Sequence, residues 1–409
     1  MRIAFLNSAY PLGSTGRIIQ SLEARLGAGG HEVFVAFGHG QSSSDHHFAS
    51  QSRLQQVVSV GKTRAFGKHG FYDLRSTARM LQWLESVTPD LVHLHNLHGH
   101  YLNLPMIFSL LLELDVPVIW TLHDCWALTG HCTHFDYNGC TRWETGCFAC
   151  PNLASYPRSL LFDRSKSSWK EKAELFSSLR DLRLIVPSNW LGGLVARSHL
   201  RNRPVQLIHN GVDLSIFHPS SNPERAVRDS KSLTILGMAT KWLDPRNRRV
   251  VQEIAQNLSP HDRLLLVGTK PKDLPSSLGL RAEAIDFVAS PIALAELYRR
   301  ADVFVNLTLE DTFPTVNLEA LACGTPVITF DSGGSPEAVD RKTGAVVRRG
   351  DASGVLIALE QFRISDRQSF RDACATRAAA LYDRDRTFDE HLTLYGLAMG
   401  SRRSTDRPG

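Results

Sequence analysis

Short, continuous apolar runs alternate with amphipathic segments along most of this 409-residue chain. In the amphipathic segments apolar residues recur every three or four positions, which is the spacing of one helix face. The apolar runs are typical of strands that are buried on both faces. In the first half the pattern predicts helices such as 18–26 and 190–198, and strands at 3–6, 32–37, 91–94, 118–122, 182–186 and 205–208.

The second half repeats this alternation. Strands are predicted at 233–238, 264–267, 303–306 and 327–330, and helices at 250–258, 293–300 and 316–322. Buried strands that alternate with helices indicate an α/β fold in which helices cover both faces of parallel sheets.

The length favours two domains, because a chain of this size exceeds one ordinary hydrophobic core. A polar, proline-bearing stretch at 219–231 is the predicted linker. We therefore expect a first domain at 1–218 with a cysteine-rich insertion at 125–151, a second domain at 232–386, and a last helix and tail at 387–409 that cross back to the first domain.

The composition is that of a globular protein, with no sign of a nucleic-acid-binding or membrane-spanning protein. Hydrophobic residues make up 43% and charged residues 21% of the chain, as in globular proteins. A net charge of +5 and the lack of a known motif give no reason to expect nucleic acid as a partner. The apolar stretch 102–120 contains two acids and two prolines, and falls short of the ~20 clean residues that span a bilayer. A cytoplasmic location is expected, and peripheral contact with the inner face of the plasma membrane stays open.

The segment 306–330 carries the most specific chemistry. Asp311 and Glu319 stand eight positions apart, and a turn between them leads into a helix from about Thr315. A helix start presents backbone N–H groups that suit a phosphate, and carboxylates accept hydrogen bonds from sugar hydroxyls. The pattern predicts a pocket for a phosphorylated sugar such as a nucleotide-sugar. The alternative is a helix with one exposed Glu and one capping Asp.

Other turns at strand ends carry glycines or cations. Gly13, Gly16 and Arg17 follow the first strand, although a plain strand–turn–helix connection would look the same. Gly333 and Gly334 follow the strand at 327–330. A further group of cations, suited to neutralising a leaving pyrophosphate, follows the strand at 233–238. These cations are Lys241, Arg246, Arg248 and Arg249.

Histidines crowd into two strand ends. Four of them lie in the run HLHNLHGH at 93–100, without an interleaved carboxylate or cysteine. This favours a mixture of core histidines and ligand-facing histidines over a metal site. His123 ends the next strand and is the candidate catalytic residue of the first domain, with a buried structural histidine as the alternative.

Seven cysteines in an intracellular chain argue against a disulfide framework. Five of them lie within 125–150, and this clustering needs its own explanation. Cys132, Cys140, Cys147 and Cys150 have the residue types of a tetrahedral structural zinc site. Reduced buried thiols and redox-active thiols are the alternatives.

The segment 156–176 mixes basic residues with large apolar ones. Such a mixture suits attachment to an anionic membrane surface, and it equally fits a solvated amphipathic helix.

Taken together, these motifs resemble a known family. The spacing of Asp311 and Glu319, the run WTLHD at 120–124, VPSNW at 186–190, NGVD at 210–213 and GGSPE at 333–337 resemble elements of the retaining glycosyltransferases of family 4. The runs HNLHGHYLN, WTLHDCWALTGHC and GCFACP resemble a subgroup found in colanic-acid-type and other exopolysaccharide clusters. The resemblance implies the GT-B fold, in which two Rossmann-like domains with parallel sheets face a central cleft.

The resemblance also implies roles. Asp311 would contact the transferred sugar, Glu319 the ribose, and His123 would lie by the reacting sugar. Backbone amides of the loop between the acids would hold sugar and phosphate, and these belong to Thr312, Phe313, Pro314, Thr315 and Val316. The glycine-rich loop at 13–17 would lie near the donor phosphate or the acceptor, and Gly333 and Gly334 near the donor.

Lys241 and Arg246 would neutralise the leaving pyrophosphate. Asn247 stands where the family commonly has a lysine, so the second phosphate-binding cation is uncertain from sequence.

The expected activity is retaining transfer of a hexosyl unit from a UDP- or GDP-sugar to a sugar or polyprenyl-linked glycan. No catalytic metal or other cofactor is expected beyond a structural zinc. A nucleotide-sugar 2-epimerase of the same fold and a non-catalytic binding protein are the alternatives.

Overall fold

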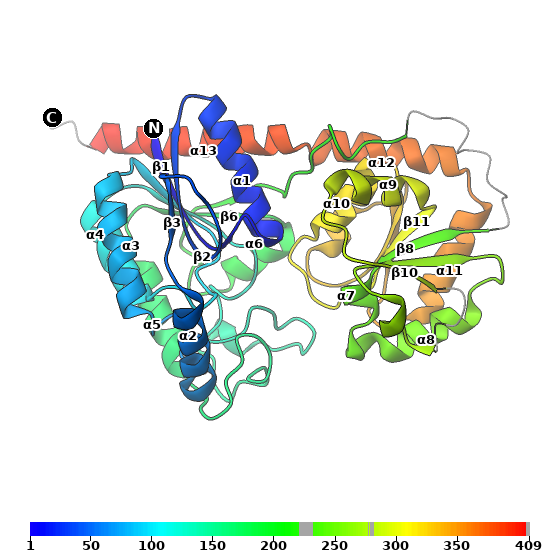
Figure 1. The fold of residues 1–409 in the computed structure, drawn as a ribbon, viewed down its shortest axis with the longest axis horizontal. Coiled ribbons are helices and arrows are strands. Elements are labelled where there is room, and N and C mark those ends of the chain that lie inside the picture. The colour runs from blue at the N-terminus through cyan, green and yellow to red at the C-terminus, as the bar shows by residue number, and fades with distance from the viewer. Residues whose placement is uncertain (221–231, 277, 279–281, 406–409) are drawn as a thin grey trace. The chain divides into compact units, whose positions relative to one another are not determined.

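A computed structural model describes residues 1–220, 232–276, 278 and 282–405, without the side chains of Arg53 and 401–405. The contacts divide the chain into two compact units. The first consists of Met1–Ile208 together with the C-terminal helix from Phe388 onward, and the second of His209–Thr387 (Figure 1).

The first unit is built on a seven-stranded parallel sheet with the order β3-β2-β1-β4-β5-β6-β7. Its strands are β1 (Arg2–Tyr10), β2 (Glu32–Gly40), β3 (His47–Ala49), β4 (Leu91–Leu94), β5 (Val118–Thr121), β6 (Leu182–Val186) and β7 (Val205–Leu207). Side chains of β1 alternate between the two faces, so that Ile3 and Phe5 join one core while Ala4 and Leu6 join the other.

Helices cover both faces of this sheet. The helices α1 (Gly13–Ala28) and α13 (Arg384–Thr405) pack on the face of Phe5, and α3 (Leu74–Val87), α4 (Leu104–Leu114), α5 (Ser165–Ser178) and α6 (Asn189–Ala196) pack on the other. The helix α2 (Arg53–Phe66) contributes no residue to either core. Between β5 and α5 the only helical element is the short η1 (Arg142–Glu144).

The second unit has a six-stranded parallel sheet with the order β10-β9-β8-β11-β12-β13. Its strands are β8 (Thr234–Met238), β9 (Arg263–Val267), β10 (Ala282–Ile285), β11 (Val303–Asn306), β12 (Val327–Phe330) and β13 (Gly344–Val347). Its helices are α7 (Ala239–Trp242), α8 (Arg248–Asn257), α9 (Pro291–Arg300), α10 (Thr315–Ala322), α11 (Ala352–Ile364) and α12 (Arg367–Leu381), with the short turns η3 (Pro245–Asn247), η4 (Pro271–Asp273) and η6 (Ser335–Ala338).

Both sheets reverse their strand order at one point, between β1 and β4 in the first unit and between β8 and β11 in the second. Ligands of open parallel sheets bind at the carboxyl ends of the strands beside such a point. The predicted fold class of parallel α/β sheets is confirmed, and the topology directs attention to one edge of each sheet.

The division between the units falls at residue 208, whereas the sequence placed the boundary at 218. Val212, which follows β7, forms two backbone hydrogen bonds with the last residues of the second unit in sequence. Its amide donates to Tyr382 O, and its carbonyl accepts from the Arg384 amide. Phe217 is buried in a core of the same unit. The predicted linker at 219–231 lies outside the described residues from position 221 onward.

Within the described residues, no helix combines the length and the apolar character that crossing a membrane requires.

Candidate functional site

Polar groups gather at the carboxyl edge of the second unit's sheet. Lys241 follows β8, Glu310 and Asp311 follow β11, and Gly333 and Gly334 follow β12. Because these three strands are neighbours, the groups that follow them meet at the same edge. The structure therefore brings together residues that the sequence assigned to one site.

The predicted cations stand against acids at this edge. Lys241 Nζ lies 3.7 Å from Asp311 Oδ2, with side chains that are 33% and 27% exposed. Arg246 donates to Glu310 at 3.0 Å and to Asp244 at 2.8 Å. The hydrogen bonds that Arg246 donates to the Asp244 carboxylate raise the pKa of Arg246 above its ordinary value, so the guanidinium stays charged. Both cations remain accessible enough to meet an anionic ligand.

The backbone of Asp311 is fixed by the glycine turn. Gly334 donates its amide to Asp311 O at 3.0 Å, and the Asp311 carboxylate accepts from the Phe313 amide at 3.3 Å. Gly333 has a φ of +57°, and a Cβ at that position would lie 1.9 Å from Asp311 O. The turn thus needs a glycine both for its left-handed backbone and for its close approach to the acidic loop.

The helix α10 begins at Thr315, as predicted, without a side-chain cap at Pro314. A helix start of this kind presents backbone N–H groups and the positive end of the helix dipole. Thr312 and Phe313, which precede it, are buried. Glu319 lies one turn into α10, and its Oε2 accepts from the Tyr298 hydroxyl at 3.1 Å.

A buried amide network anchors α10. Asn317 Nδ2 donates to Ser335 Oγ at 2.9 Å, and Asn317 Oδ1 accepts from Asn306 Nδ2 at 2.8 Å. These residues come from α10, η6 and the end of β11. Sequence reasoning missed all three, and also Tyr298, because single Asn, Ser and Tyr residues carry no spacing signal.

Asn247, at the position of the family lysine, has a structural role. It is 1% exposed, and its Nδ2 donates to Lys241 O at 2.8 Å and to Leu307 O at 2.7 Å. The amide therefore joins α7 to the segment after β11 and does not reach outward as a phosphate-binding cation would.

In the first unit, His123 follows β5 and pairs with His95. Its Nε2 lies 2.9 Å from His95 Nδ1, and the rings stack with centroids 5.2 Å apart. Burial lowers the pKa of His123 to about 4 and the pKa of His95 well below its ordinary value. Both rings are therefore neutral near pH 7 and share one N–H between them. His95 Nε2 is buried and has no hydrogen-bond partner within the described residues.

The remaining histidines of the 93–100 run have separate partners. His93 is buried between Tyr395 Oη at 2.7 Å and Thr121 Oγ1 at 2.8 Å, which makes it a satisfied core histidine. His98 Nε2 lies 2.6 Å from Asp124 Oδ2. Among the described residues, no group of three or more His, Cys, Asp or Glu side chains is arranged to hold a metal ion.

The glycine-rich segment of the first unit forms the first turn of α1. Gly13 has a φ of +71° and opens the helix. A Cβ on Gly16 would lie 3.0 Å from Ala9 O, so glycine permits α1 to approach the end of β1. Arg17 is exposed and its Nε donates to Gly13 O at 3.3 Å. Since β1, β4 and β5 are adjacent, this turn and His123 share one edge of the sheet.

Cys147 lies close enough to Cys132, Cys140 and Cys150 for their charges to interact, but within the described residues no group of three or more of these side chains is arranged to hold a metal ion. Cys132 and Cys150 hydrogen-bond to each other, whereas Cys147 Sγ accepts from the Gly130 amide at 3.3 Å. Cys132 and Cys147 are buried, and Cys140 and Cys150 are partly exposed. The arrangement of these thiols gives no support to a four-thiolate site. Bound zinc stays a prediction that metal analysis of protein purified without chelator tests.

The segment 156–176 is not one amphipathic helix. The helix α5 starts only at Ser165, and it buries Phe176 and Lys172. Lys172 Nζ donates to Trp126 O at 2.5 Å and Thr129 O at 2.7 Å, so these hydrogen bonds stabilise the turn at 126–129. The amino group is withdrawn from solvent, and burial lowers its pKa to about 7. The large hydrophobic residues exposed in this segment lie before α5, at Tyr156 and at Leu160–Phe162.

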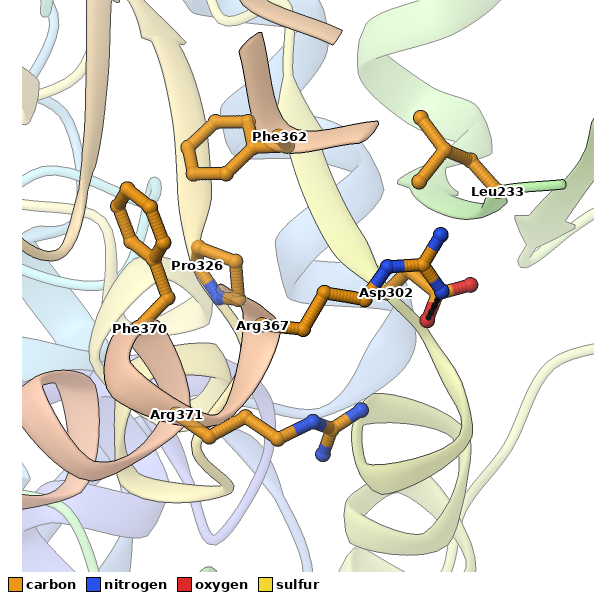
Figure 2. A pocket seen from close by; sticks show the side chains of 7 residues that line it. All are labelled: Leu233, Asp302, Pro326, Phe362, Arg367, Phe370 and Arg371. Carbon is orange, nitrogen blue, oxygen red and sulfur yellow. Dashed lines mark hydrogen bonds and ion pairs between the residues drawn. The ribbon is translucent and has the colours of Figure 1, made fainter. Parts of the chain in front are cut away.

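A narrow pocket in the second unit lies at the opposite, amino edge of the sheet. Figure 2 shows it beside Leu233, Asp302 and Pro326, which precede β8, β11 and β12. Asp302 forms an ion pair with Arg367 there at 3.1 Å. This pocket is remote from the residues of the candidate site, and its ion pair joins α12 to the sheet.

Each of the two units matches a family of glycosyltransferases. Residues 15–216 match the family described as Glycosyltransferase Family 4, and residues 239–362 match the family described as Glycosyl transferases group 1. A relative in Escherichia coli K12, "Putative colanic acid biosynthesis glycosyl transferase WcaC", is 25% identical over 364 residues, which cover 85% of this chain and 87% of the relative.

A second relative, the D-inositol 3-phosphate glycosyltransferase of Stackebrandtia nassauensis, is 32% identical over 221 residues. That match covers 48% of this chain and 49% of the relative, so the chain spans about half of that protein's length.

Solved structures share the fold at low sequence identity. The sucrose-phosphate synthase of Thermosynechococcus elongatus has a TM-score of 0.68 at 16% identity, with 98% of this chain and 99% of that chain covered. The Anabaena protein HepE in complex with UDP has a TM-score of 0.67 at 14% identity, with 97% and 100% covered.

Proposed function

Because this chain is a glycosyltransferase of the GT-B fold that carries the family 4 and group 1 domains, we propose that it transfers a hexosyl unit from a nucleotide diphosphate sugar with retention of anomeric configuration. The acceptor is a sugar or a polyprenyl-linked glycan, in surface polysaccharide synthesis at the inner face of the plasma membrane. One observation carries the proposal. The ion pairs Lys241–Asp311 and Arg246–Glu310 lie at the same sheet edge of the second unit as the glycine turn that follows β12.

The relatives indicate a donor class. The WcaC relative is named for colanic acid biosynthesis, and HepE has been solved with UDP and with UDP-glucose. We therefore propose a UDP-sugar as the first donor to test, with GDP-sugars alongside it.

Each group at the site has a matching part of such a donor. The N-terminus of α10 and the amides of the glycine turn suit the diphosphate, since both present N–H donors. Glu319 is assigned to the ribose hydroxyls and Asp311 to a hydroxyl of the transferred sugar, because ionised carboxylates only accept hydrogen bonds.

The ion pairs suggest which cation meets the leaving pyrophosphate. Arg246 is bound by two carboxylates at hydrogen-bond distance, whereas Lys241 stands 3.7 Å from one. Moving Lys241 toward a phosphate costs less, so we assign it the main share of the developing charge and Arg246 a supporting share. Lys241 would thus supply the positive charge that the family commonly places on a lysine at the position of Asn247.

We propose front-face departure, in which the leaving phosphate oxygen takes the proton of the attacking hydroxyl. These cations and the helix dipole supply the positive charge, so the proposed reaction does not call for a divalent metal. His123 is neutral near pH 7 because burial lowers its pKa to about 4, and it suits hydrogen bonding to a sugar hydroxyl better than proton abstraction.

A donor-binding assay on Glu319→Ala tests the proposal. We expect its affinity for the UDP- or GDP-sugar that stabilises the wild type to fall at least about ten-fold, because a charge-assisted hydrogen bond contributes about 1.5–3 kcal/mol. Glu283→Ala is the matched control, since that exposed carboxylate of the same unit pairs with the exposed Arg263. Near-normal turnover by Glu319→Ala would count against the assignment.

Nucleotide release separates the alternative functions. Release that requires an acceptor supports transfer, donor turnover without acceptor indicates an epimerase, and binding without turnover indicates a non-catalytic protein. The anomeric configuration of the product, read by NMR, tests retention.

A further inference from the structure

Two neighbouring histidines lie just after the adjacent strands β4 and β5. His95 follows β4 and is 1% exposed, whereas His123 follows β5 and stays partly exposed. His95 Nδ1 lies 2.9 Å from His123 Nε2, and the planes of the two rings differ by 14°. A ligand that meets His123 therefore meets a ring whose orientation depends on the buried His95.

The ring of His95 is held firmly in place. Its backbone carbonyl accepts from Trp120 Nε1 at 2.8 Å. Its imidazole packs against the rings of Phe5 and His93, with centroids 5.6 and 4.2 Å away. Because both the backbone and the ring are fixed, His95 cannot turn away from His123 without repacking the core around Phe5.

The proton that lies between the two rings has a preferred origin. Burial holds the pKa of each ring below its ordinary value, so both rings are neutral near pH 7 and each carries a single N–H. His95 Nε2 is buried and has no hydrogen-bond partner within the part of the chain that the structure describes. In native backbones an orphaned buried N–H is rarer than an under-satisfied acceptor, and the same preference applies to a ring nitrogen. The proton of His95 therefore belongs on Nδ1, which donates it to His123 Nε2.

This assignment fixes the tautomer of His123. Since its Nε2 accepts a hydrogen bond, its single proton lies on Nδ1. The second nitrogen of the ring is then a donor and not a base. It can donate to the oxygen of a sugar hydroxyl, but it cannot take up the proton of an attacking hydroxyl.

We infer that His95 is a positioning residue for the transfer reaction, which donates to His123 Nε2 and thereby makes His123 an Nδ1–H donor to a hydroxyl oxygen of the bound sugar. The inference rests on the proposed function, because it specifies the direction of a hydrogen bond in that reaction. It agrees with the proposed proton transfer to the leaving phosphate, since an imidazole that only donates leaves that proton for the phosphate oxygen.

NMR of the histidine rings reads the tautomer without any need for turnover. In protein labelled with ¹⁵N-histidine, two-bond correlations between ring nitrogens and carbon-bound protons distinguish a protonated nitrogen from an unprotonated one. The signals of His123 are those that disappear in His123→Gln. We expect wild-type His123 to carry its proton on Nδ1 at pH 7. In His95→Leu its proton should redistribute toward Nε2, because nothing then donates to that nitrogen.

Three substitutions of His95 separate its hydrogen bond from its packing. The amide nitrogen of Asn can take the place of Nδ1, whereas that of Gln takes the place of Nε2, so only Asn restores the donor. We expect His95→Leu and His95→Gln to lower kcat by roughly ten- to hundred-fold with little change in donor KM, because a displaced group near the reacting atoms costs up to about 100-fold. His95→Asn should keep kcat within about three-fold of the wild-type value, since its amide supplies an N–H.

His199→Leu is the matched control. It removes another imidazole with buried nitrogens from the same unit, one that packs against Trp169 and Phe176, and it should leave kcat unchanged. Thermal melts establish that each variant is folded. If His95→Leu fails to fold, the wild-type spectrum and the comparison of Asn with Gln still decide.

A wild-type His123 that carries its proton on Nε2 overturns the inference. So does a His95→Gln variant that is as active as His95→Asn, because the position of the donor would then be irrelevant. If His123 has the Nδ1–H form in the wild type and loses it in His95→Leu, but no nucleotide-sugar is turned over, His95 still fixes the tautomer of His123 and the proposed reaction fails.

Discussion

Gly333 is the residue at which backbone geometry most tightly constrains the acidic loop. Gly333→Ala would place a methyl group 1.9 Å from Asp311 O and strain a φ of +57°. The turn must shift, and the bond from Gly334 to Asp311 is lost with it. We expect donor affinity to fall at least about ten-fold and stability to fall by several kcal/mol, of which left-handed strain alone contributes about 1–2.

The control for this change is Gly139→Ala. Gly139 has a similar φ of +59° but nothing within 4 Å of the added methyl group. Gly139→Ala should therefore lower the free energy of unfolding in urea by about 1–2 kcal/mol, which is the cost of left-handed strain alone. Its donor binding should be normal. Equal effects of the two substitutions would mean that the contact with Asp311 has no role.

His199 offers a test of how buried imidazoles limit acid stability. Neither ring nitrogen has a hydrogen-bond partner within the described part of the chain, and the ring packs against Trp169 and Phe176. Burial lowers its pKa to about 3. As pH falls below 6.5 the unfolded chain takes up the proton first, so stability is lost progressively between pH 6.5 and about 3.

His199→Phe keeps the aromatic contacts and removes this proton uptake. The variant should therefore gain stability relative to the wild type by about 2 kcal/mol on going from pH 7 to pH 5. Urea unfolding at the two pH values measures this difference. An unchanged pH dependence would show that His199 is solvated in solution.

At the residue scale the sequence predicted the acids and glycines but not their partners. Asp311, Glu319 and Gly333 were found because spacing and turn chemistry are visible in a single chain. Tyr298 and His95 were not assigned to Glu319 and His123, because a hydrogen bond between distant positions leaves no local pattern.

At the scale of elements, Asn247 joins η3 to α7 and to the segment after β11. Asn247→Ala removes both of its backbone hydrogen bonds and leaves the carbonyls of Lys241 and Leu307 unpaired. We expect a loss of about 2 kcal/mol and weaker donor binding, since Lys241 and Asp311 would be held less firmly. Asn257→Ala is the control, because this exposed amide donates to Glu253 O of its own helix. Its loss should cost less than about 0.5 kcal/mol.

Buried strands were the elements most easily predicted, and α2 was the least. Continuous apolar runs mark β4, β5 and β11 directly. β1 continues past its predicted end at Leu6, because Asn7 is buried and its side chain bonds to the backbone of Ala9 and Asn96. The helix α2 contains Gly61 and several β-branched residues of low helix propensity, so its sequence gave no clear helical pattern.

At the scale of the whole molecule, alternation of strands and helices predicted two α/β units, whereas their limits depended on tertiary contacts. Residues 209–218 lie before the predicted linker yet pack in the second unit. The strand orders also depend on tertiary contacts, because parallel strands that are distant in sequence pair side by side without a local pattern.

The first unit needs the end of the chain to complete its core. Phe388, Leu394 and Tyr395 of α13 are at most 7% exposed and pack with Phe5 and its neighbours. Burying three such side chains contributes roughly 5–9 kcal/mol, which is comparable to the whole stability of a domain. Tyr395 also hydrogen-bonds buried His93, whose Nδ1 would otherwise lose its partner.

A chain that ends at Thr387 should therefore give little soluble protein, and any that is recovered should lack the cooperative melting transition of the first unit. A chain that ends at Gly400 keeps these three side chains and should melt close to the full-length protein. Soluble yield and differential scanning calorimetry distinguish the two. A stable first unit in the shorter chain would show that β1, α1 and their neighbours bury enough apolar surface alone, and α13 would then act only as a covering helix.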